Sequence, residues 1–217
     1  MNEPSGGTLG RRSFLSVAGG LAAAASVGFA PAALAAAPAA STSANGWPLR
    51  HKDIAQFKVE GSGAVVALRS GDVATVLLHV ARRFHYEVAP LRPGQISQTG
   101  GSAPFESNYL SGTAFAIRPD LYPAGAKGNF FPHELAAVRD VLAECEGIVR
   151  WGGDFKKSPK EGHFQLDVKP GDIKLVRVAR KIAQWSPGKA AGTPRDVFDE
   201  SRRRPAKVLA ERQIATG

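Results

Sequence analysis

The order of apolar patterns along the chain is the feature that most constrains its fold. Three segments carry apolar residues at helical spacing, over 72–84, 133–145 and 172–185. Short apolar or alternating runs between them predict strands, over 54–59, 64–68, 112–117, 148–151 and 164–168. Because the strands and helices do not alternate regularly, the pattern predicts one α+β domain with a small, mostly antiparallel sheet flanked by about three helices.

The first 35 residues have the composition of an export signal. Arg11 and Arg12 form a twin-arginine pattern, an apolar run follows over 17–37, and Ala33-Leu34-Ala35 offers a cleavage site. A transmembrane anchor is the alternative, but the run is rich in Ala and Gly and contains Pro31, which favours a cleaved signal. The sequence therefore predicts export by the twin-arginine route to the periplasm, wall or medium, with no membrane span once the signal is removed.

The remaining chain divides by composition into three parts. Residues 36–46 are rich in Ala, Pro, Ser and Thr and predict a disordered linker, and 47–185 hold the folded domain. Residues 186–217 carry seven basic and four acidic side chains, and their Arg, Lys, Pro and Gly content predicts a disordered tail. The single cysteine, Cys145, ends a helical pattern and is expected to be a small buried apolar residue.

The charge of the chain limits its partners. Without residues 1–35, the chain keeps 26 basic and 18 acidic side chains. This excess suits anionic surroundings such as wall polymers or lipid headgroups. Nucleic acid is not expected, because there is no basic groove with interleaved aromatic residues and the export signal argues against it.

Two segments carry the patterns that bear on function. The first, over 107–118, reads SNYLSGTAFAIR, and the second, over 148–168, reads IVRWGGDFKKSPKEGHFQLDV. In this order they resemble the active-site halves of the zinc D-alanyl-D-alanine carboxypeptidases, a family that includes vancomycin-resistance carboxypeptidases and L-alanyl-D-glutamate endolysins. The resemblance covers about residues 65–185. It implies the small zinc-peptidase architecture and a role in cutting peptidoglycan stem peptides.

The resemblance also implies which positions carry the chemistry. The family places two zinc ligands, a His and an Asp, where this chain has Tyr109 and Ala116, and the third where it has His163. Glu161 stands at the position of the general base. A catalytic zinc needs three protein ligands and an open position for water, so two of the three ligands are missing.

The expected consequence is an inactive relative without zinc. Its cleft is predicted to be lined by Tyr109, Ser111, Trp151, Asp154 and His163, and at most to bind stem peptides, with Glu161 a surface carboxylate. The alternative is an active zinc peptidase that uses substitute ligands, for which Glu106, Asp120 and His133 are conceivable. A third reading is an unrelated binding or structural role in which the basic tail holds anionic polymer.

Overall fold

The computed structural model describes residues 41–50, 52–184 and 196–216. The described residues all belong to one compact unit, Ala39–Gly217. The predicted export signal lies outside the described residues.

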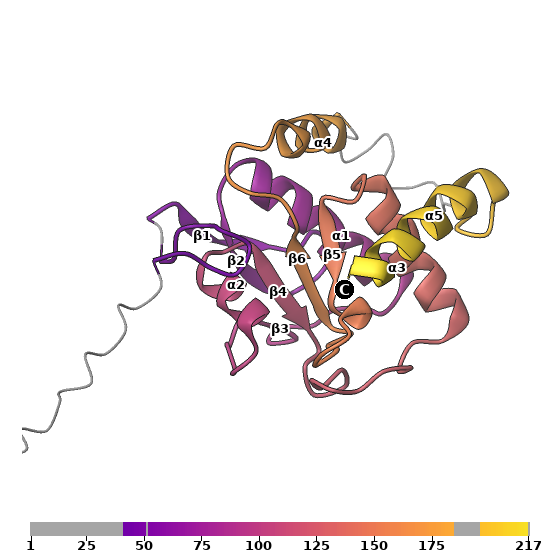
Figure 1. Ribbon diagram of the computed structural model, residues 1–217, viewed down its shortest axis with the longest axis horizontal. Helices are drawn as coiled ribbons and strands as arrows, with labels where there is room; N and C mark the ends of the chain where they lie inside the picture. Colours follow the sequence, from indigo (N-terminus) through magenta and orange to yellow (C-terminus); the bar gives the residue numbers. More distant parts are fainter. Residues whose placement is uncertain (1–40, 51, 185–195, 217) are drawn as a thin grey trace, which may run out of the picture. The chain divides into compact units, whose positions relative to one another are not determined.

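The domain is α+β, as the sequence predicts, with two small antiparallel sheets (Figure 1). β1 (Ile54–Lys58) and β2 (Val65–Arg69) form a hairpin, and the larger sheet has the order β3-β4-β6-β5. Its strands are β3 (Ile96–Ser97), β4 (Ala114–Ile117), β5 (Val149–Trp151) and β6 (His163–Leu166). Five α-helices accompany these sheets among the described residues, where the sequence predicts about three.

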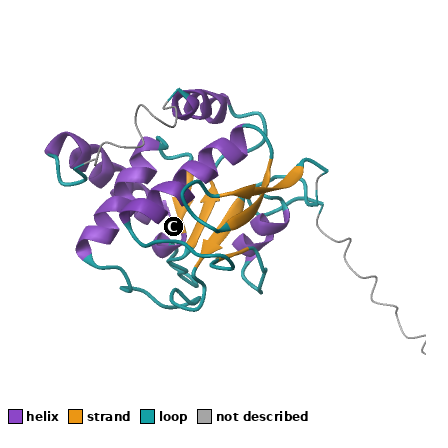
Figure 2. Cartoon of the chain, turned by 180° about the vertical axis from the view of Figure 1, so that it is seen from behind, coloured by secondary structure: helices purple, strands orange, loops and turns teal. Residues whose placement is uncertain are grey.

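The helices lie mainly on one side of the larger sheet (Figure 2). They are α1 (Asp72–Glu87), α2 (Ser107–Leu110), α3 (Pro132–Glu144), α4 (Ile173–Ala183) and α5 (Glu200–Thr216). Two short 3₁₀ turns, η1 (Pro104–Glu106) and η2 (Gly152–Asp154), flank the strands that carry the two motifs. The three helical patterns of the sequence correspond to α1, α3 and α4.

Alternation along β4 and β6 gives the larger sheet two different faces. One face is fully buried in the main core and carries Phe115, Ile117, Phe164 and Leu166. There the ring centroids of Phe84, from α1, and Phe164 lie 6.3 Å apart. The opposite face carries the intervening residues of the same strands, Ala114, Ala116, His163 and Gln165. The apolar face therefore builds the core, and the second face is free to build a site.

The two sheets meet at Gly112, which follows α2. The backbone N–H of Arg69 donates to the carbonyl of Gly112 at 3.0 Å. A Cβ at residue 112 would lie 2.7 Å from that same nitrogen, and the residue has a φ of 68°. Only glycine satisfies both conditions without strain, so the Ser-Gly-Thr sequence of the first motif fixes where β4 begins.

The linker prediction over 36–46 is wrong for its described part. Asn45 donates from its side-chain amide to Thr113 and to the carbonyl of Leu166, at 2.9 and 3.0 Å. Trp47 is buried and donates from Nε1 to the carbonyl of Val168 at 2.7 Å. These bonds hold residues 41–49 against the domain, which a composition rich in Ala and Ser does not reveal.

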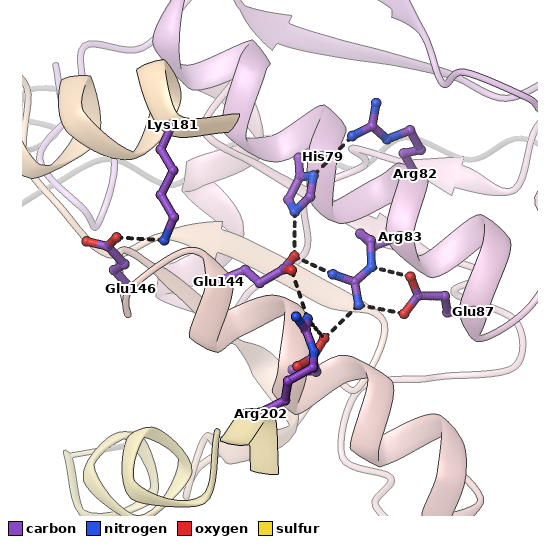
Figure 3. A network of polar contacts seen from close by, with 9 residues as sticks. His79, Arg82, Arg83, Glu87, Glu144, Glu146, Lys181 and Arg202 are labelled. Atoms are coloured by element: carbon purple, nitrogen blue, oxygen red, sulfur yellow. Dashed lines mark hydrogen bonds and ion pairs between the residues drawn. The ribbon is translucent and has the colours of Figure 1, made fainter. Parts of the chain in front are cut away.

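The disordered-tail prediction over 186–217 is also wrong where the structure describes it. Helix α5 packs on α3, and its buried side chains are those of Ala206, Leu209 and Gln213. At its start, Arg202 donates to Asp140 at 2.5 Å and to Glu144 at 2.8 Å (Figure 3). The buried stripe mixes polar and apolar residues, so it has no clear apolar periodicity, and its arginines suggest a solvated tail instead.

The inner face predicted for the third helix is partly wrong. Val176 is half-buried and Ala179 and Ile182 are buried, but Ile173 is 75% exposed and Ala183 is also exposed. Leu175 and Val178 take part in the buried stripe instead. Helix α4 is thus rotated about its axis relative to the predicted orientation, and its cations gather around Ile173.

Candidate functional site

The three positions at which the resembled family holds zinc converge in space. The antiparallel pairing of β4 with β6 places Ala116 directly opposite His163 on the second face of the sheet. Helix α2 places Tyr109 over the same spot, with its hydroxyl oxygen 2.8 Å from Nδ1 of His163. Segments more than fifty residues apart in sequence therefore build one site.

Both ring nitrogens of His163 are engaged. Nε2 lies 2.9 Å from Oε1 of Gln165, the next residue on the same strand face. The same oxygen accepts a hydrogen bond from the side-chain amide of Asn108 at 2.8 Å. An amide oxygen only accepts, so Nε2 carries the hydrogen, and in the neutral ring Nδ1 accepts the hydroxyl proton of Tyr109.

The surroundings keep this pair uncharged. His163 is fully buried, and its desolvation lowers the pKa of the imidazole to about 4. Burial also raises the pKa of the Tyr109 phenol, and the nearby carboxylate of Glu106 raises it further. At neutral pH the two residues are therefore a neutral phenol and a neutral imidazole joined by a hydrogen bond.

Two aromatic rings cover the imidazole. Phe105, in η1, and Phe155, just after η2, have ring centroids 4.7 and 5.7 Å from that of His163. Phe105 and Phe155 also contact each other, at 4.7 Å. Phe155 belongs to the second motif and Phe105 lies just before the first, and together these two half-buried rings form an aromatic cover over the site.

A buried ion pair lies beside the cover. Nζ of Lys160 is 2.7 Å from Oε1 of Glu106, and both side chains are less than a tenth exposed. The ammonium also lies 5.3 Å from the centre of the Tyr109 ring. Desolvation opposes ionisation of Glu106, but its hydrogen bond to Lys160 and the ammonium charge outweigh this, so the carboxyl pKa is lowered. A buried ion pair therefore stands beside Tyr109.

Ser111 supports the site without facing it. Its hydroxyl donates to the carbonyl of Asn108 at 3.0 Å and lies 2.8 Å from that of Thr113. Both hydroxyls are buried, and they satisfy backbone groups where α2 ends and β4 begins. The predicted binding residue Ser111 thus positions Asn108 and, through it, Gln165.

Trp151 and Asp154 do not line the site with Tyr109 and His163, contrary to the sequence prediction. Trp151 pairs across the strands with Phe164, which places it on the apolar face of the sheet. Asp154 accepts two hydrogen bonds from Arg139 of α3, at 2.5 and 2.6 Å, and the guanidinium lies 4.8 Å from the Trp151 ring. These two residues attach η2 to α3.

Glu161 is not a surface carboxylate, and it does not point toward His163. It is buried, and its oxygens accept from the backbone N–H groups of Gly128 and Asn129 at 2.8 and 2.9 Å. The side chain of Asn129 donates a third bond at 2.8 Å. Glu161 therefore holds the loop before α3, and its carboxylate has no hydrogen bond to the Tyr109–His163 pair.

The donor set does not fit a zinc ion. Ala116 offers a methyl group, Tyr109 holds its proton, and the imidazole lone pair on Nδ1 accepts that proton. Of the conceivable substitutes, Glu106 is paired with Lys160, and His133 is exposed and stacks on Phe131. No group of three His, Cys, Asp or Glu side chains suited to a metal occurs within the described ranges.

The sequence prediction missed Gln165, Lys160 and the two covering rings, and it considered Glu106 only as a substitute metal ligand. Gln165 had a usable signal, because strand alternation places residue 165 on the same face as His163. The ion pair had no sequence signal, because Glu106 and Lys160 are fifty-four residues apart and no sequence pattern links the two positions.

Comparison with known protein families, with curated proteins and with solved structures finds no match to this chain. In the part of the chain that the structure describes, no helix has the length and apolar character needed to cross a membrane.

Proposed function

We propose that this chain is an exported cell-wall protein built on the frame of the D-alanyl-D-alanine carboxypeptidases and that it has no peptidase activity. One observation carries the proposal. Tyr109, Ala116 and His163, which stand at the family's three ligand positions, come together in a single site. An accidental match of two short motifs has no reason to bring these three positions together.

The chemistry of the site supports the absence of catalysis. Metal-assisted peptide hydrolysis needs an ion that activates water and a carboxylate that takes the proton from it. Here the imidazole is hydrogen-bonded on both nitrogens and covered by Phe105 and Phe155. The carboxylate at the base position, Glu161, is committed to three N–H groups of a loop.

A binding role at this site rests on its rim. The half-buried rings of Phe105 and Phe155 are the parts of the aromatic cover that reach the surface. Lys156 and Lys157, next to Phe155, are exposed and supply positive charge. A stem peptide with its carboxylates suits an aromatic rim with adjacent cations, and this is the ligand class that we propose.

The test combines two measurements on the full chain. Zinc content after dialysis against zinc, and D-Ala release from a stem pentapeptide, are both expected to stay at background. Co-sedimentation with purified peptidoglycan is expected to fall in the Phe105→Ala/Phe155→Ala variant. The matched control is Phe131→Ala, since Phe131 is exposed and distant in sequence from both rings.

Stoichiometric zinc together with D-Ala release overturns the inactive assignment and favours a peptidase with substitute ligands. Sedimentation that is the same in wild type, the rim variant and the Phe131→Ala control removes the proposed binding role.

A further inference from the structure

All the charged residues of helix α4 are cationic, and none of them is on its buried side. Four of its residues are cationic, Lys174, Arg177, Arg180 and Lys181, and none of Ile173–Ala183 is acidic. Its buried residues are all apolar, Leu175, Val178, Ala179 and Ile182. The helix is therefore amphipathic with its apolar side in the domain, and its charge is concentrated outward.

Two of the four cations pair with the same carboxylate, that of Glu146. Glu146 accepts from Lys181 at 2.9 Å (Figure 3). It also accepts from Arg177 at 2.5 Å, and these two bonds lower the pKa of its carboxyl. One carboxylate thus serves two cations, whose side chains stay 64% and 42% exposed. Lys174 and Arg180 are exposed and form no ion pair with a described residue.

An aliphatic side chain stands among these cations. Ile173, at the start of α4, is 75% exposed, more than any other large hydrophobic residue in the part of the chain that the structure describes. A shallow depression of about 370 Å³ is lined by Ile173, Val176, Arg177, Arg180, Lys181 and Gln184. Figure 1 shows α4 at the periphery of the domain.

We propose that the outer face of α4 docks on an anionic lipid surface, with its cations on the headgroup phosphates and Ile173 in the interfacial layer. Each Lys or Arg near an anionic bilayer adds attraction, and an exposed aliphatic residue among cations gains further by leaving water at the acyl boundary. A soluble phosphate polymer satisfies the cations but leaves Ile173 in water. The combination therefore favours a lipid surface over a wall polymer.

The test places its readout on α4 itself, because the apolar run over 17–37 of the full chain has its own affinity for lipid. An environment-sensitive dye is attached to the full chain at Ile173→Cys. The native Cys145 is fully buried and its burial raises the pKa of its thiol, so it stays unlabelled. The matched control carries the dye at Val208→Cys, on an exposed position of α5.

Vesicles that contain phosphatidylglycerol are expected to shift the emission of the dye at residue 173 to the blue. The emission of the dye at residue 208 is expected to stay unchanged. Phosphatidylcholine vesicles are expected to give no shift, and added salt to reverse it. Neutralising two cations in Lys174→Gln/Arg180→Gln is expected to weaken the response about thirty-fold, at ~1 kcal/mol per cation. Arg203→Gln/Lys207→Gln removes the same charge from exposed positions of α5 and is expected to change little.

Three results overturn the proposal. The first is no shift at residue 173 on anionic vesicles. The second is that the α4 and the α5 charge variants weaken the dye's response to anionic vesicles equally, which means that net charge alone attracts the protein. The third is that soluble polyphosphate reproduces the response and vesicles do not, which assigns the face to a polymer. None of these results bears on zinc or on wall peptides, so this proposal fails independently of the proposed function.

Discussion

The hydroxyl of Tyr109 donates a hydrogen bond to Nδ1 of His163 over 2.8 Å, in an environment that excludes water from the imidazole. Tyr109→Phe removes the donor and leaves a buried acceptor without a partner, which costs about 1–3 kcal/mol. We expect the free energy of unfolding, measured in urea, to fall by this amount.

The control for this change is Tyr86→Phe, because Tyr86 is 59% exposed. The free energy of unfolding of Tyr86→Phe is expected to stay within about 0.5 kcal/mol of the wild-type value. Equal small losses in the two variants contradict the hydrogen bond between Tyr109 and His163.

Acid is expected to weaken the domain through His163. Its pKa is about 4 in the folded protein, below the ordinary value of about 6.5 for the unfolded chain. Between these values the unfolded state binds the proton and the folded state does not, so stability falls as the pH falls. The free energy of unfolding therefore loses about 3 kcal/mol once the pH lies below both pKa values.

The measurement is urea unfolding of wild type and His163→Gln across the same acidic range. The stability gap between the two proteins is expected to narrow on acidification, because the variant lacks the titrating imidazole. Parallel curves mean that His163 is not buried as a neutral ring.

The buried pair of Lys160 and Glu106 predicts a strong coupling. Lys160→Met leaves the Glu106 carboxylate buried without its partner, which costs about 3–5 kcal/mol. Lys160→Met/Glu106→Gln removes both charges and is expected to recover much of this loss. A double-mutant cycle measured by chemical denaturation checks the coupling, and additive losses contradict the pair.

Helix α5 supplies a test of the correction to the predicted tail. Leu209 is 9% exposed and belongs to the main core, so Leu209→Ala is expected to cost about 2–3 kcal/mol. The adjacent Val208 is 52% exposed, and Val208→Ala is expected to cost less than about 0.5 kcal/mol. A thermal-unfolding comparison in which both variants match wild type means that α5 does not pack on the domain.

Local pattern was sufficient for the elements of the domain core. The apolar stripe of Val73, Val76, Leu77 and Val80 predicts α1, and alternation over 164–168 predicts β6, because in both the side-chain period sets which face is buried. Local pattern did not predict α5, because Arg202 and Gln213 bind partners that are far away in sequence. These partners are the side chain of Asp140 and the backbone carbonyl of Val149. Ile173 was misplaced because the rotation of α4 is set by its packing on α1.

For the site, the sequence predicted which residues occupy the key positions but not how they interact. The resemblance implied that positions 109, 116 and 163 belong together, and the structure places them so. The orientation of Glu161 toward Gly128 and Asn129 was not predictable, because a carboxylate in a motif takes whichever N–H groups the fold brings to it. The pairing of Trp151 with Phe164 depends on register, and a one-residue change in register exchanges the faces.

The most direct test of the proposal that Tyr109 and Ala116 stand at two zinc-ligand positions is the zinc affinity of Tyr109→His/Ala116→Asp. It is measured by calorimetry beside wild type and each single variant. A complete zinc site is worth on the order of 10 kcal/mol. We expect the double variant to bind one zinc ion per chain, the single variants to bind weakly, and wild type to show no saturable binding. Stoichiometric binding by wild type, or a folded double variant without zinc affinity, contradicts the account.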